Sequence, residues 1–232
     1  MSPGLYTEGP SAYQGCFIVN LESKTPTLRI AGRTGEDGTE IEEIPRRLRA
    51  DAQRNRERLM AVAKTAFADV GPDVSLDEIA RRAGVGIGTL YRHFPTRDAI
   101  VEAVYRREVQ QLADAATRLL GSLPAAEALH QWMRLFVDYI ATKKVMVSAL
   151  DSIVDGTSEL YACSRTQVTE AICLLVDRAA ETGDIRPGVD PNDVLRGLVG
   201  FTYGNTSPGW QESALRLIDI MMDGLRAPCG AD

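Results

Sequence analysis

The chain has 232 residues, of which 44% are hydrophobic and 25% are charged, and its formal net charge is −6. This is the composition of a globular protein that is long enough to build a real core. No apolar run is long enough to span a bilayer and no basic-then-apolar leader opens the chain, so we expect a cytoplasmic protein without membrane contact.

The sequence carries few of the groups that catalysis or metal binding requires. It has two histidines and four cysteines, and the cysteines are far apart with no C-x-x-C pair. No nucleophile–base pair, carboxylate pair or metal-ligand spacing stands out. We therefore expect no enzyme activity, no metal and no cofactor, and we interpret each cysteine as a small buried hydrophobe.

Residues 1–49 precede the first strong helical pattern and are predicted to form an N-terminal extension. Residues 1–44 are rich in Gly, Thr, Glu and Pro and lack helical periodicity, which indicates a mobile segment without a core of its own. An alternative is that the natural start lies later, in an over-long reading frame. The basic run at residues 45–49 could reach a minor groove or phosphates, although the preferred interpretation is a solvated run of charge.

A first long helix is predicted over residues 51–70. Its apolar side chains recur at i, i+3, i+4, i+7, i+8 and i+11 and form one stripe: Leu59, Val62, Ala63, Ala66, Phe67 and Val70. Gly71 and Pro72 stop this helix. Arg54, near its start, is a candidate phosphate contact. We expect the helix to support the next segment from behind.

Residues 74–94 predict two short helices joined by a tight turn. Ser75 and Glu78 have the spacing of a capping box, in which the Ser hydroxyl accepts the N–H three residues on and the Glu carboxylate reaches back. Gly84 can take the left-handed conformation that ends the first helix, and Pro95 stops the second. The apolar positions suit two helices that cross over a common core, as in a helix-turn-helix.

The second of these helices leaves a set of polar side chains pointing outward: Thr89, Tyr91, Arg92 and His93. Such groups hydrogen-bond phosphate oxygens and base edges. Gly86 and Gly88 remove side chains near the start of the helix, where a phosphate could approach backbone N–H groups. A nucleotide-binding loop is the alternative for this glycine run, but Tyr91 stands where G-x-G-x-x-G has its third glycine, and a helix precedes the run.

The stretch SLDEIARRAGVGIGTLYRHFPTRDAIVEAV resembles the N-terminal DNA-binding domain of TetR-family transcriptional regulators. The resemblance covers residues 54–104, and it implies an all-α fold. An N-terminal helix-turn-helix DNA-binding domain at residues 50–97 would precede a larger helical ligand-binding and dimerisation domain at residues 98–232. Arg97 occupies the position where the family usually has a phosphate-contacting Lys. The residues expected to contact double-stranded DNA are Arg54, Ser75, Gly88, Thr89, Tyr91, Arg92, His93 and Arg97.

The distribution of charge agrees with this division. Residues 50–97 contain eight basic and six acidic residues, a net charge of +2, whereas residues 98–232 contain twelve and nineteen, a net charge of −7. Charge on one face matters more for DNA binding than the total does. A mildly basic head on an acidic body is therefore compatible with a DNA-binding protein.

Six further helices are predicted beyond Pro95, at residues 97–120, 125–143, 145–154, 158–182, 191–203 and 209–225. Asp190 is expected to cap the fifth of these, with Pro191 at its first position. In the family picture, tilting of the helix at residues 97–120 carries a ligand signal to the DNA-reading helix. A ligand can do this only through different affinities for the two states of the protein.

Two functional surfaces are expected in this helical body. An apolar or aromatic small-molecule effector would lie among Trp132, Phe136, Tyr139, Met146, Leu150, Tyr161 and Tyr203, with His130 as a candidate polar anchor. Ordinary core packing is the alternative for each of these residues. The resemblance also implies a homodimer interface built from two helices of each subunit, with Val194, Leu195, Leu198, Phe201, Leu215, Ile218 and Met222 as the candidate residues.

The predicted function is that of a ligand-responsive DNA-binding transcriptional regulator. It would be a repressor that binds a palindromic operator as a homodimer and is released by a small molecule. Two reading helices spaced by about 34 Å, or by a multiple of that distance, would read such a site. The alternative is a helical adaptor that uses the same fold for protein contacts without effector control, and absence of DNA affinity would favour it.

Overall fold

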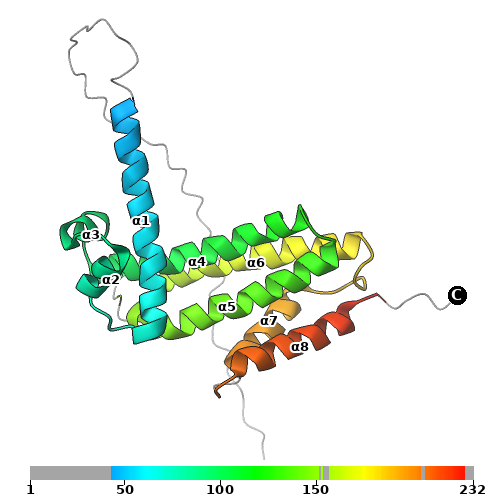
Figure 1. Cartoon of the computed structure of the whole chain (residues 1–232). Coiled ribbons are helices and arrows are strands. Elements are labelled where there is room, and N and C mark those ends of the chain that lie inside the picture. The colour runs from blue at the N-terminus through cyan, green and yellow to red at the C-terminus, as the bar shows by residue number, and fades with distance from the viewer. Residues whose placement is uncertain (1–42, 152, 154–156, 205–206, 228–232) are drawn as a thin grey trace, which may run out of the picture. The chain divides into compact units, whose positions relative to one another are not determined.

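The computed structural model describes residues 43–151, 153, 157–204 and 207–227. Over these residues the chain forms eight α-helices and no β-strand, which confirms the all-α prediction (Figure 1). The helices are α1 (Glu43–Val70), α2 (Leu76–Ala83), α3 (Ile87–His93), α4 (Arg97–Leu120), α5 (Ala125–Asp151), α6 (Thr157–Glu181), α7 (Pro191–Tyr203) and α8 (Trp210–Leu225). None of these described helices is sufficiently long and apolar to cross a membrane.

Two helix boundaries differ from the prediction. α1 begins at Glu43, so residues 43–49 are helical and do not belong to an irregular extension. Pro45 is tolerated there because the N–H groups of a first helical turn have no acceptor within the helix. The rest of the predicted extension, residues 1–42, lies outside the described residues. α5 is one unbroken helix where two were predicted, because Lys143 and Lys144 are good helix formers and do not interrupt it.

The C-terminal half of α1 forms the back of the N-terminal head, which consists of α1, α2 and α3. The predicted stripe is confirmed where it faces the core: Leu59, Ala63, Ala66 and Phe67 are all at most 1% exposed. The prediction is wrong for Val70, which is 57% exposed. This residue ends the helix, and the chain turns away at the next position, so nothing covers it.

The helices α4, α5 and α6 form the central layer of the body (Figure 1). α4 contacts both α5 and α6, while α7 and α8 pack against each other and against α5. The side chain of Trp132 is fully buried, and its indole N–H donates to the carbonyl of Leu112 at 2.8 Å. α7 begins as predicted, because the Asp190 carboxylate accepts the N–H of Asn192 at 2.8 Å and Pro191 takes the first helical position.

Candidate nucleic-acid interface

α2 and α3 form the predicted helix-turn-helix, and α2 has a capping residue at each of its two ends. The Ser75 hydroxyl accepts the N–H of Glu78 at 3.2 Å. Gly84 ends the helix with a φ of 65°, the left-handed conformation that a residue with a Cβ rarely takes. Leu90 and Phe94 are 0% and 1% exposed, so they anchor α3 to the core of the head. The opposite side of α3 is thereby left facing outward.

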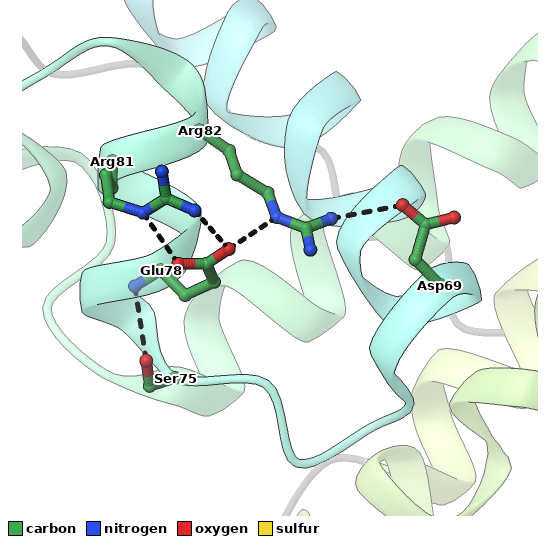
Figure 2. A network of polar contacts seen from close by, with 5 residues as sticks. All are labelled: Asp69, Ser75, Glu78, Arg81 and Arg82. Carbon is green, nitrogen blue, oxygen red and sulfur yellow. Dashed lines mark hydrogen bonds and ion pairs between the residues drawn. The ribbon is translucent and has the colours of Figure 1, made fainter.

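The Glu78 side chain does not complete the capping box as predicted. Figure 2 shows its carboxylate accepting from both arginines at the end of α2, at 2.8 and 2.7 Å from Arg81 and 2.7 Å from Arg82. Two guanidinium groups three and four residues on attract the carboxylate more strongly than one neutral N–H does. Arg82 also donates to Asp69 of α1 at 3.1 Å. We call Glu78, Arg81, Arg82 and Asp69 the α2 clamp.

The α2 clamp changes where positive charge is available on the head. Hydrogen bonds from Arg81 and Arg82 lower the pKa of Glu78 to about 2, so the carboxylate is ionised near neutral pH and neutralises one guanidinium. Asp69 supplies a second negative charge beside Arg82. The two arginines of α2 therefore form ion pairs within the head.

The outward side of α3 carries side chains that are not paired within the head in this way. Tyr91 is 47% exposed, Arg92 is exposed, and Thr89 and His93 are half-buried. Among the described residues, no side-chain hydrogen bond or ion pair engages Thr89, Tyr91 or Arg92. A Cβ added at Gly88 would meet no atom within 4 Å, so the surface beside it is open. These groups are free to meet phosphates and base edges.

Arg56 of α1 holds the C-terminal end of α3 in place. Its guanidinium donates to the carbonyl of His93 at 3.3 Å and lies 4.6 Å from the centre of the Phe94 ring. A cation at this position is stabilised by the partial negative charge of a helix C-terminus and by the aromatic face. Arg54, which was predicted to contact DNA, is exposed and paired with Asp51 on its own helix.

Arg97 is engaged within the head. Its guanidinium donates to the carbonyl of Val74 at 2.6 Å and to that of Pro72, so the first turn of α4 is tied to the loop that precedes α2. The side chain is half-buried, with its charged end 6.0 Å from the centre of the Phe67 ring. The geometry favours a structural role for this arginine over the phosphate contact that the sequence suggested.

Among the described residues, the candidate effector residues divide between core positions and three separate cavities. Trp132 and Leu150 are fully buried and Phe136 is 2% exposed, as expected for core packing. Tyr139 lines one surface cavity, Met146 a second and Tyr203 a third. Tyr161 is half-buried and stacks edge-on against another tyrosine of the body, at a centroid distance of 5.8 Å.

Several polar atoms of this aromatic group have hydrogen-bond partners within the chain. The hydroxyls of Tyr105 and Tyr139 lie 3.1 Å apart, and burial raises the pKa of Tyr139. Burial also raises the pKa of Tyr161 to about 12. His130, the candidate polar anchor, instead pairs with Asp219 of α8 at 2.8 Å. A ligand that bound the hydroxyls of Tyr105, Tyr139 or Tyr161 would compete with these hydrogen bonds.

The candidate dimer residues divide into two groups. Val194, Leu198, Ile218 and Met222 are at most 4% exposed within the single chain, and Leu195, Phe201 and Leu215 are half-buried against the same core. The first four lie between α7, α8 and the body, so a second copy could not reach them at the surface. The apolar side chains that α7 and α8 expose are instead Val199 at 41%, Tyr203 at 44% and Ile220 at 67%. Hydrophobic periodicity selected several positions that are buried within the single chain, because a buried stripe is the stronger pattern.

Two features of the site were missed at the level of sequence. The ion pairs of Glu78 in the α2 clamp could have been predicted, because a Glu is followed three and four residues later by Arg, and residues at these spacings are neighbours on a helix. The ion pair between Lys64 of α1 and Glu108 of α4, at 2.5 Å, joins residues 44 positions apart and leaves no local signal.

An exposed polar helix held at the front of a capped helix-turn-helix, ahead of an all-helical body, defines a DNA-binding transcriptional regulator. Comparison with known proteins agrees with this class. Residues 59–104 match the family model described as "Bacterial regulatory proteins, tetR family", and residues 124–227 match "Transcriptional regulator SbtR-like, C-terminal domain".

Solved structures and curated relatives point the same way. The TetR transcriptional regulator SCO0520 from Streptomyces coelicolor is 42% identical with a TM-score of 0.69, over 75% of this chain and 99% of that one. A TetR regulatory protein from Mycobacterium vanbaalenii is 36% identical with a TM-score of 0.66, over 78% and 99%. An HTH-type transcriptional regulator of Staphylococcus aureus is 36% identical over 110 residues, which cover 47% of this chain and 58% of the relative's length. The chain belongs to the TetR family of transcriptional regulators.

Proposed function

We propose that the protein is a repressor that binds a palindromic operator as a homodimer and is released by a small molecule. The observation that carries the proposal is the outward side of α3, where Thr89, Tyr91 and Arg92 are unengaged within the described chain. Arg81 and Arg82, by contrast, are neutralised within the α2 clamp. Residues 50–97 would act as the DNA-binding domain and residues 98–232 as the effector-binding and dimerisation domain.

DNA binding through α3 is tested by fluorescence anisotropy with duplex DNA from beside the protein's own gene. Arg92→Ala and His93→Ala should each weaken binding by roughly 10-fold or more, because a direct base or phosphate contact is lost. Arg178→Ala is the matched control, since that arginine is exposed on α6, outside both proposed interfaces, and pairs with Glu181 three residues later. Wild-type affinity in both α3 variants would remove these residues from the interface.

The number of phosphates contacted can be measured from the dependence of affinity on salt. If the dimer contacts roughly six or more phosphates, the logarithm of the binding constant should fall steeply with the logarithm of salt concentration. A flat dependence, or no binding to any DNA from that region, would favour the adaptor alternative. A reporter gene placed behind the same DNA distinguishes repression from activation.

The proposed dimer interface is the outer face of α7 and α8. Ile220→Asp would place a charge on the most exposed apolar position of α8 and should convert the dimer to a monomer without lowering the stability of the single chain. Leu198→Ala, at a fully buried position of α7, should instead lower stability by about 2–5 kcal/mol. Sedimentation velocity and chemical denaturation measure the two effects separately. A dimer that survives Ile220→Asp would place the interface elsewhere.

A further inference from the structure

A cavity lies where the head meets the body. It has a volume of about 370 Å³ and is bounded by Lys64, Phe67 and Ala68 of α1 and by Ala141, Val145 and Met146 of α5. The C-terminal end of α1 and the C-terminal part of α5 lie beside one another there (Figure 1). We call this space the seam cavity. Its volume falls within the range of small-molecule sites, which is about 300–1,000 Å³.

The seam cavity combines apolar walls with a single charge. Phe67, Val145 and Met146 are among its apolar lining residues, and threonine and glutamine side chains add neutral polar groups. Lys64 is the one charged residue among the lining residues that the structure describes. A lysine beside apolar walls complements an anion attached to an apolar body, because the ammonium group can donate to the anion while the walls cover the apolar part.

Lys64 also holds the head to the body. Its ammonium group lies 2.5 Å from the carboxylate of Glu108 on α4, and the Glu108 side chain is only 9% exposed. The same lysine lines a second cavity, of about 340 Å³, together with Glu108. Lys64 therefore lines both cavities, and its ammonium group is paired with a buried carboxylate.

We propose that the seam cavity is the effector site, and that its ligand is a small organic carboxylate with an apolar body. The carboxylate would bind the ammonium group of Lys64, and the apolar body would pack against Phe67, Val145 and Met146. This inference rests on the proposed ligand-responsive function, and it moves the effector from the centre of the body to the junction with the head.

Ligand binding at this position competes with the tie between α1 and α4. A ligand carboxylate draws Lys64 away from Glu108 and leaves a carboxylate that is only 9% exposed without its cation, which is unfavourable. The state in which α1 has moved away from α4 thus binds the ligand better than the state in which the ion pair is intact. Because α1 carries Arg56, which holds the end of α3, this difference in affinity couples the ligand to the DNA-reading helix.

The site is tested by calorimetry on the full chain with two matched probes, 4-phenylbutyrate and its neutral amide. The carboxylate should bind roughly 10-fold or more tightly than the amide, as expected for a charge-assisted hydrogen bond. Lys64→Met should remove this preference. Lys143→Met is the matched control, because Lys143 lies on α5 but lines a different cavity, and it should leave the preference unchanged.

Two further variants decide the question if Lys64→Met does not fold. Glu108→Gln removes the competing carboxylate and should tighten binding of 4-phenylbutyrate, whereas Ala141→Leu fills the cavity and should weaken binding of both probes. Equal affinity for the two probes, or unchanged affinity in Glu108→Gln and Ala141→Leu, would overturn the proposed site.

DNA affinity of the wild-type protein is measured first, without any probe. If there is none, the proposed regulatory function fails, while the calorimetry still reports on the site. If DNA binds, 4-phenylbutyrate at saturation should lower its affinity, and Lys64→Met should abolish that effect. Binding of the carboxylate through Lys64 without any change in DNA affinity would overturn the effector role of the seam cavity.

Discussion

Replacement of Arg97 by methionine separates a structural role from a DNA-contacting one. The variant loses the hydrogen bonds to the carbonyls of Pro72 and Val74 but keeps most of the apolar stem beside Phe67. A hydrogen bond from a charged donor contributes about 1.5–3 kcal/mol when it is buried. Because Arg97 is half-buried, water can satisfy part of what is lost, and we expect a loss of about 2 kcal/mol for the two bonds together.

For a chain of this length, such a loss lowers the melting temperature by roughly 4–8 °C, which differential scanning calorimetry resolves easily. Arg92→Met is the matched control: that exposed arginine has no side-chain partner among the described residues, so its melting temperature should stay within about 1 °C of the wild type. DNA affinity is measured for both variants over a range of salt. If Arg97→Met melted like the wild type and lost about one unit of salt slope, Arg97 would contact a phosphate and our assignment would be refuted.

Three other changes test the local structure. Ser75→Ala removes the cap of α2 and should lower the free energy of unfolding by about 1 kcal/mol in urea titrations, while Ser75→Asp should retain it. The pKa of Glu78 is lowered from 4.5 to about 2, so its contribution to stability is complete above pH 4.5 and is lost as the pH falls to about 2. Carboxyl NMR titration should show that midpoint, and replacing Arg81 and Arg82 by Ala should return it towards 4.5. Trp132→Phe removes the bond to the Leu112 carbonyl and leaves a void, and should lower the free energy of unfolding by about 2 kcal/mol.

Much of the head could be predicted from the sequence, because its helix ends depend on residues that are close together in the chain. The positions of Ser75, Gly84 and Asp190 predicted helix ends correctly, because a cap needs only a few neighbouring residues and a specific backbone conformation. The apolar stripe of α1 was equally readable except at Val70, whose exposure depends on where the chain turns next. Helix caps and apolar stripes, which involve residues close together in the sequence, could therefore be predicted.

Contacts that depend on packing between helices far apart in the sequence could not be predicted. Lys64 and Glu108 meet only because α1 and α4 cross, and neither residue carries a local sign of the other. Four of the seven candidate dimer residues on α7 and α8 are buried within the single chain, since hydrophobic spacing shows that a face is covered but does not show what covers it. Arg97 illustrates the same limit, because its acceptors are backbone carbonyls, which every sequence contains.

The link between Arg97 and the loop before α2 has a mechanical consequence. If α4 pivots, a hinge between α3 and α4 alone would pull the guanidinium off both carbonyls, so the easier motion carries α1, α2, α3 and the first turn of α4 together as one rigid unit. In the proposed dimer, regulation would then change the distance and angle between the rigid units of the two subunits, while the structure of each unit is preserved. A single half-site would be recognised equally well in either state, and only the span across the full palindrome would be read differently.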